Sequence, residues 1–176
     1  MKKHFILTCV LFSNLFVFAQ KGTVFPDISG KSLADKYVGL PVKNGKTTVV
    51  GIAYHRAAET ELKKWLNPLY NTFIPKPGEA KTFDVAEIYD VNFIFIPMIA
   101  GFKKVAEEFK ASTDKEFWPY IMDTEKTDIN KLKEKLGVKD DKIPYFYILD
   151  KDGKILEAVN GKFSEEKMDK LEEAAE

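Results

Sequence analysis

The sequence has almost no cysteine. Its one thiol, Cys9, lies in an apolar segment near the start of the chain that we expect to be removed. Disulfide exchange and cysteine-based peroxide reduction both need a thiolate, so we expect neither reaction from the remaining chain. Disulfide bonds cannot stabilise that chain either. Its core must come from apolar packing, for which fourteen Phe and seven Tyr residues supply large rings.

A long apolar run is also missing. The apolar stretch 5–18 is interrupted by Ser13 and Asn14, and it is shorter than the roughly 20 residues that a membrane-spanning helix needs. We therefore expect no stable insertion into the membrane once this segment has been cleaved.

The ends of the same stretch have the layout of a secretory signal peptide. Lys2 and Lys3 precede it, and Ala19 follows it as a small residue at a cleavage site. We predict a signal peptide over residues 1–19 and a single domain over residues 20–176. The mature protein is then exported, and is periplasmic or extracellular. The alternatives are an uncleaved membrane anchor and a lipoprotein modified at Cys9.

A strong net charge is absent as well. The chain has 27 basic and 27 acidic side chains. Removal of Lys2 and Lys3 leaves 25 basic against 27 acidic side chains, a formal charge of −2. This balance gives no electrostatic footprint for nucleic acid or for an anionic membrane surface.

The usual signatures of metal and phosphate sites are missing too. His55 is the only histidine left after cleavage, and one histidine without cysteine cannot build a usual zinc site. No twelve-residue calcium loop and no Gly-rich phosphate loop occur, and residues 150–153 (DKDG) are typical of a plain turn. We expect no cofactor and no metal.

Apolar periodicity predicts alternating strands and helices. Predicted strands cover residues 47–54, 84–91, 117–122, 145–149 and 154–159, and predicted helices cover 57–73, 99–110, 128–136 and the segment that Ser164 caps. The aromatic run 93–98 (FIFIPM) is predicted to be core strand and helix entry, with an exposed docking surface as the alternative. We expect Pro68 to kink or break its helix near Asn67, and Pro119 to place its strand at an edge. The order β-α-β-α-β-α-β-β-α indicates an α/β fold with a central mixed β-sheet flanked by helices.

Two segments carry a family resemblance. Residues 143–155 (IPYFYILDKDGKI) resemble the part of thioredoxin-like, TlpA-type redoxins in which a cis-proline precedes a strand and a D-x-D-G hairpin. Residues 25–28 (FPDI), with Ser32 and Leu33, resemble the lead of the same family, which a small β-hairpin follows. The resemblance covers about residues 24–171 and implies a thioredoxin-like fold.

Fewer residues suggest a narrower family. The chain is similar to the mitochondrial ATP synthase assembly factor family in a combination of residues: Leu40-Pro41, Gly45-Lys46, and Trp65 with Pro68. This resemblance implies a role in assembly.

The chain departs from the redoxins where strand becomes helix. Active members carry W-C-x-x-C there, whereas residues 54–61 read YHRAAETE. Depending on a shift of one residue, the two cysteine positions hold Ala58 and Glu61, or Ala57 and Thr60. None of these side chains replaces a thiolate, so the redox activity of the family does not carry over.

Polar residues at this junction have two interpretations each. His55 is a proton carrier or ligand contact, or else a strand-end residue with only local hydrogen bonds. Arg56 holds a carboxylate or phosphate, or else pairs with a nearby glutamate such as Glu59 or with solvent.

Pro144 offers a further candidate contact. If its peptide bond is cis, the backbone of Ile143 faces the junction, where thioredoxin-like proteins receive extended peptides by strand-like hydrogen bonding. Alternatively, the proline only shapes the fold.

Two functions follow. The first is an exported, redox-inactive, non-enzymatic protein that binds a protein or peptide of the cell envelope as a chaperone or assembly factor. Its candidate groove comprises His55, Arg56, Ala58, Glu61, Ile143 and Pro144. The alternative is a cysteine-independent enzyme or small-ligand binder that uses the His55 and Arg56 crevice with Glu59 or Glu61.

Overall fold

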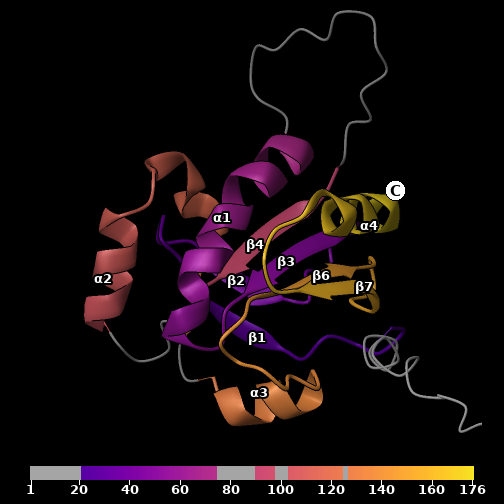
Figure 1. Ribbon diagram of the computed structural model, residues 1–176, viewed down its shortest axis with the longest axis horizontal. Helices are drawn as coiled ribbons and strands as arrows, with labels where there is room; N and C mark the ends of the chain where they lie inside the picture. Colours follow the sequence, from indigo (N-terminus) through magenta and orange to yellow (C-terminus); the bar gives the residue numbers. More distant parts are fainter. Residues whose placement is uncertain (1–20, 75–89, 98–102, 125–126) are drawn as a thin grey trace, which may run out of the picture.

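The protein is built around a four-stranded sheet in the order β4-β3-β6-β7 (Figure 1). A computed structural model describes residues 21–74, 90–97, 103–124 and 127–176, with the backbone alone for 103–106. The strands are β3 (Thr48–Ile52), β4 (Asn92–Ile96), β6 (Tyr145–Leu149) and β7 (Ile155–Asn160). β3 runs parallel to β4 and antiparallel to β6, so the sheet is mixed, as predicted.

A smaller antiparallel sheet has the order β2-β1-β5. Its strands are β1 (Ile28–Ser32), β2 (Tyr37–Leu40) and β5 (Met122–Thr124). The β1–β2 hairpin confirms the small hairpin predicted after residues 25–28. β1 and β5 approach so closely at Gly30 that a methyl group there would overlap the carbonyl of Asp123. This point of the sheet therefore requires a residue without a side chain.

Helices and the smaller sheet give the central sheet one apolar core on each face. The helices are α1 (Arg56–Phe73), α2 (Lys103–Ala111), α3 (Ile129–Lys135), α4 (Glu165–Ala175) and the short 3-10 helix η1 (Lys115–Tyr120). α1 and α4 pack over strand residues such as Phe95 and Phe146. β1 and α3 cover the opposite face, over residues such as Val50 and Tyr147. β6 is buried at every position because both faces are covered.

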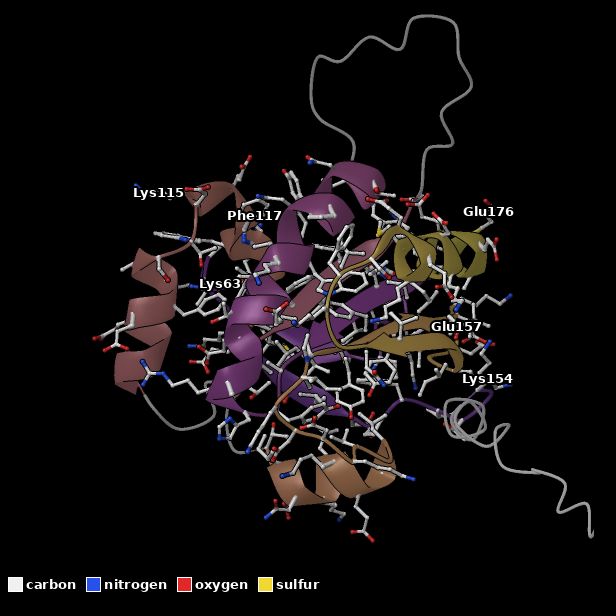
Figure 2. The ribbon with its side chains drawn as sticks, viewed as in Figure 1. Lys63, Lys115, Phe117, Lys154, Glu157 and Glu176 are labelled. Atoms are coloured by element: carbon white, nitrogen blue, oxygen red, sulfur yellow. The ribbon has the colours of Figure 1, made fainter. Side chains whose placement is uncertain are left out.

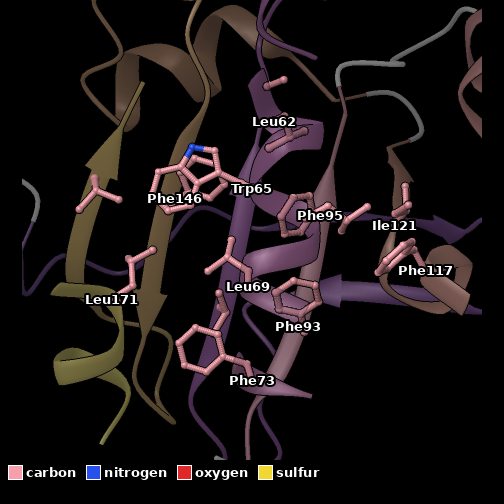
Figure 3. Packing of buried hydrophobic residues seen from close by; sticks show 14 of the residues in the cluster. Leu62, Trp65, Leu69, Phe73, Phe93, Phe95, Phe117, Ile121, Phe146 and Leu171 are labelled. Carbon is pink, nitrogen blue, oxygen red and sulfur yellow. The ribbon is translucent and has the colours of Figure 1, made fainter. Parts of the chain in front are cut away.

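Trp65 lies at the centre of the first core (Figure 3). It is fully buried, and the centroid of its ring is 4.2 Å from that of Phe146. Its indole Nε1 donates a hydrogen bond to the carbonyl of Gly161 at 3.0 Å. Leu62 and Leu69 lie on the same face of α1, which confirms the helical spacing predicted from the sequence.

The break, one of the two outcomes expected at Pro68, does not occur, and one detail of the last helix is wrong. α1 continues through Pro68 as far as Phe73, so the helix is not broken near Asn67. α4 begins after Ser164 as predicted, but the Ser164 side chain makes no capping hydrogen bond.

Some predicted strand boundaries also change. The predicted strand 117–122 is wrong, because η1 occupies Lys115–Tyr120 and the strand begins only at Met122. Pro119 fits inside η1, where its missing N–H is tolerated. The strand predicted at 84–91 is described only from residue 90, and β4 begins at Asn92. Residues 84–89 of that prediction and residues 99–102 of the next helix lie outside the described residues.

The cis bond that the redoxin resemblance implies at Pro144 does not occur. Within the described residues the one cis peptide bond joins Leu40 to Pro41.

None of the helices in the described residues is both long enough and apolar enough to cross a membrane.

Candidate functional site

The junction that holds the predicted site residues lies at one end of the two inner strands, where β3 ends and β6 begins; we call this end the binding edge. Ile52, the last residue of β3, pairs with Tyr145, the first residue of β6. The chain that continues from β3 into α1 therefore lies beside the chain that leads into β6. This register places His55 and Arg56 on one side of the edge and Ile143 and Pro144 on the other.

His55 begins the first helix. It is the N-cap residue of α1, with extended backbone, and its Nδ1 accepts a hydrogen bond from the Ala57 N–H at 3.0 Å. An imidazole in this position satisfies one of the amide groups that the first turn of a helix leaves unpaired. His55 is exposed, so the remainder of its ring faces solvent at the edge of the site.

Arg56 reaches a different helix from the one predicted. Its Nη2 lies 3.3 Å from Glu108 Oε2 on α2, and not against Glu59. Both side chains of this pair are largely exposed, at 72% and 49%. The guanidinium is therefore solvated and its pair is weak.

Glu59 carries an unusual carboxylate in the first turn of α1. Its Oε1 is buried. Among the described residues it is the one buried side-chain nitrogen or oxygen atom without a hydrogen-bond partner. Burial raises the pKa of Glu59, and the opposing positive charges of Arg56 and Lys63 only partly offset that increase. Figure 2 labels Lys63 on the same helix. The sequence indicated Glu59 as a partner of Arg56 and as a candidate member of the ligand crevice, but nothing in its spacing indicated burial.

The four positions considered for the missing cysteines lie in the first two turns of α1. Ala58 is fully buried, whereas Ala57 and Thr60 are exposed. Glu61 is half-buried and accepts a hydrogen bond from Lys64 Nζ at 2.7 Å. Alanine, threonine and a paired carboxylate offer no redox chemistry.

Three tyrosines, Tyr54, Tyr145 and Tyr147, pack together next to this junction. The rings of Tyr54 and Tyr145 meet edge to face with centroids 5.6 Å apart. The hydroxyls of Tyr54 and Tyr147 lie 3.5 Å apart in the second core. Burial raises the pKa of both Tyr54 and Tyr147, so their hydroxyls stay neutral. The sequence showed these residues only as apolar strand positions.

The loop that enters β6 is held in place by polar contacts. The Tyr145 hydroxyl donates to the carbonyl of Asp140 at 3.1 Å, and the Lys142 N–H donates to Asp140 Oδ1 at 2.9 Å. Lys133 Nζ donates to Asp141 Oδ2 at 3.0 Å, which lowers the pKa of Asp141. These contacts fix the loop on both sides of the edge-facing residue, Ile143.

Ile143 itself keeps its backbone groups available. Its side chain is half-buried, and no hydrogen bond within the described residues involves its N–H or carbonyl. The next carbonyl, of Pro144, accepts from the Gly161 N–H at 2.8 Å. Neither backbone group of Ile143 thus has a partner of ordinary hydrogen-bond geometry within the described residues, although the turn at residues 141–142 brings its N–H toward the Asp140 carbonyl. No group of three or more metal-ligating side chains occurs in the described part of the chain.

Sequence comparison assigns the chain to a family. The family model described as ATP10 protein matches residues 11–176. The chain belongs to the ATP10 family. This agrees with the resemblance to ATP synthase assembly factors noted from the sequence. A comparison with curated proteins gave no match.

Solved structures similar to this ATP10-family chain share its thioredoxin-like fold. The thioredoxin domain of a thiol-disulfide oxidoreductase from Bacteroides vulgatus superposes with a TM-score of 0.59 at 18% identity, over 89% of this chain and 98% of that chain. Yeast Sco1 gives 0.52 at 16% identity, over 85% and 92%. BsSco, described as a member of the Sco family of cytochrome c oxidase assembly proteins, gives 0.52 at 11% identity, over 86% and 93%. At these identities the likeness concerns the fold.

Proposed function

We propose that the protein is an exported, redox-inactive assembly factor or chaperone that binds an extended segment of a cell-envelope protein. The binding edge lies between the start of α1 and the loop before β6. Membership of the ATP10 family and the thioredoxin-like, Sco-type fold support an assembly role. BsSco is described as belonging to a family of assembly proteins, which adds a precedent on the same fold.

The Ile143 backbone is the observation that carries the proposal. Its N–H and carbonyl have no partner of ordinary hydrogen-bond geometry within the described residues, although the loop on both sides is fixed by Asp140 and Pro144 contacts. An extended peptide gains affinity when it adds main-chain hydrogen bonds to such an edge. A preformed edge also lowers the entropy cost of binding.

The absence of thiols supports binding rather than redox chemistry. Cys9 is the one cysteine of the sequence, and it lies in the predicted signal peptide. The side chains near the edge, His55 and Arg56, are exposed and suit contacts with a bound segment. Arg56 can release Glu108 at little cost, because their pair is solvated.

Photo-crosslinking from Ala57 in the native envelope tests this function. Ala57 is exposed beside the edge, so a photoreactive residue there should capture the partner. Ile143→Pro removes the N–H donor and should reduce capture at least tenfold, whereas Ile143→Val keeps the backbone and should capture normally. Arg56→Ala and Pro144→Ala test the two flanks. Failure to capture any protein, or equal capture by Ile143→Pro and Ile143→Val, would contradict the proposal.

The export step has its own test. N-terminal sequencing of the mature protein should give Gln20 as its first residue. Cell fractionation should find the mature protein outside the cytoplasm. A mature chain that still begins at Met1 would contradict cleavage.

A second candidate function rests on Glu59. Its buried, unpaired Oε1 lies in the same turn as Arg56 and next to the His55 cap, which is a polar group that a small ligand with a hydrogen-bond donor could satisfy. A thermal-shift screen should then find a compound whose stabilisation is lost in both Glu59→Ala and His55→Ala. Stabilisation that both variants retain would place the ligand elsewhere.

A further inference from the structure

The outer edge of β7 is covered by the first described residues of the chain. The Gly22 N–H donates to the Ile155 carbonyl at 2.7 Å, and the Ile155 N–H donates to the Thr23 carbonyl at 2.9 Å. The Phe25 N–H donates to the Gly153 carbonyl at 2.8 Å. Residues 21–25, here called the strap, therefore occupy the backbone groups at the start of β7.

An ion pair extends this cover along the strand. Lys21 Nζ lies 2.6 Å from Glu157 Oε2, and the other oxygen, Oε1, accepts the Ala158 N–H at 2.9 Å. The Glu157 carboxylate thus binds Lys21 of the strap through one oxygen and accepts the Ala158 N–H through the other. Figure 2 shows Glu157 and Lys154 at the outer edge of the sheet.

Within the described residues, the buried apolar anchor of the strap is Phe25. Phe25 is 1% exposed, and its ring meets that of Tyr147 at 5.3 Å in the second core. Residues 21–24 are all exposed, and the contacts described for them with β7 are backbone hydrogen bonds and the Lys21–Glu157 ion pair. Segments with few buried apolar contacts open locally more readily than the core.

An uncovered β7 edge would be open to pairing. Unpaired backbone groups on a sheet edge act as a template for another strand, and proteins protect such edges with charges or covering segments. Val24 and Leu156 are two of the three large apolar side chains exposed among the described residues, and both lie at this edge. Exposed apolar groups would add to such pairing.

We propose that the strap opens and closes on β7 without unfolding of the core, with Phe25 as its hinge. In the closed position the strap prevents β7 from pairing with another strand. The Lys21–Glu157–Ala158 contact locks this closed position.

Two glycines allow a matched test. Gly22 in the strap and Gly45 in the loop before β3 have φ of +82° and +84°, and a methyl group on either would meet nothing within 4 Å. Alanine at either position adds the same backbone strain, which shifts a local equilibrium about 5- to 30-fold. Hydrogen exchange of the Ile155 amide should accelerate by this factor in Gly22→Ala and stay at the wild-type rate in Gly45→Ala.

The same measurement can overturn the proposal. If the strap opened only when the whole fold unfolds, both variants would accelerate Ile155 exchange alike. Equal rates in wild type and both variants would also overturn it, because Ile155 protection would then not depend on the strap.

Gly22→Pro tests the protection of the edge. Proline cannot adopt the positive φ of Gly22 and has no N–H for the Ile155 carbonyl, so the strap should remain open. Light scattering coupled to size exclusion should show a mass that rises with concentration for this variant and not for Gly45→Ala. A constant mass together with an unprotected Ile155 amide would overturn the proposal. Loss of the folded state would overturn it too, because the strap would then be inseparable from the core.

Discussion

His55 and Ala57 are joined by a single hydrogen bond at the start of α1. The His55 Nδ1 accepts the Ala57 N–H at 3.0 Å, so the side chain closes the end of its own helix. The same ring is exposed at the candidate binding edge. His55 therefore has a structural role even where no ligand is bound.

Replacement of His55 should reveal this role. His55→Ala removes the acceptor from the helix end and should lower the free energy of unfolding by about 1 kcal/mol, as for other N-cap losses. His55→Asn restores a good capping acceptor and should recover most of that loss. Urea denaturation measures both. Equal midpoints for wild type and His55→Ala would show that the cap adds nothing.

Glu59 should make stability depend on pH. Burial holds its pKa above the ordinary value in the folded state, so the folded protein binds more protons than the unfolded chain as the pH rises through this interval. The destabilisation caused by ionised Glu59 is absent below the pKa of this carboxyl in the unfolded chain, about 4.3, and complete above its pKa in the folded protein. Glu59→Gln should therefore be more stable than wild type at neutral pH, by about 1 kcal/mol at most because solvent screens the partly exposed carboxylate.

Urea denaturation of both proteins from about pH 4 to pH 7 checks this sign, starting near the ordinary carboxyl pKa. The advantage of Glu59→Gln should grow as the pH rises. An advantage that is constant across the range would exclude titration of Glu59 as its cause.

Gly30 should not tolerate a side chain. A methyl group in Gly30→Ala would overlap the Asp123 carbonyl and separate β1 from β5, with a loss of about 1–3 kcal/mol or more. Gly39→Ala lies on the neighbouring strand β2 with nothing within 4 Å of the added methyl group, so its stability should stay near that of wild type. Thermal or urea unfolding compares the two. Similar stabilities would contradict the close approach of β1 and β5.

Thiol chemistry should be absent from the mature protein. Residues 20–176 contain no cysteine, so they should not accelerate the reduction of insulin by dithiothreitol. Turbidity from the precipitating insulin chains follows the reaction, and a redoxin with an intact C-x-x-C motif serves as the positive control. Activity above the buffer rate would overturn the argument from the missing thiols.

The central strands could be predicted because their composition leaves little choice. β3 and β6 lie within apolar, β-branched and aromatic runs, and both are covered on two faces. The spacing of Leu62, Trp65 and Leu69 likewise predicted the buried face of α1. These features depend on local sequence, and so they were accessible.

The helical turn η1 was not accessible in this way. Its aromatic residues and Pro119 suit an edge strand as well as a 3-10 helix. Tertiary packing decides between them, because the Phe117 ring meets Tyr70 of α1 at 4.9 Å. The isomer at Pro144 was equally hidden, since cis and trans X-Pro bonds differ by only about 0.5–1 kcal/mol.

The position of the β3–α1 junction could be predicted from the sequence, but the side-chain contacts around it could not. The β3–α1 junction was placed correctly, with His55 at the start of the helix. The partner of Arg56 is Glu108, 52 residues further along the chain, and no local spacing indicates that contact. The bond from the Tyr145 hydroxyl to Asp140 was missed because tyrosine in a buried strand is typical of a core residue.

That last bond has a consequence for where the protein can work. The loop before β6 takes its shape from a tyrosine hydroxyl and a main-chain carbonyl, together with the Lys133–Asp141 pair. Neither contact involves a thiol or a disulfide, and neither needs a metal ion. The edge should therefore keep one shape in oxidising and reducing surroundings alike, so that a partner would meet the same surface whatever the redox state of the compartment.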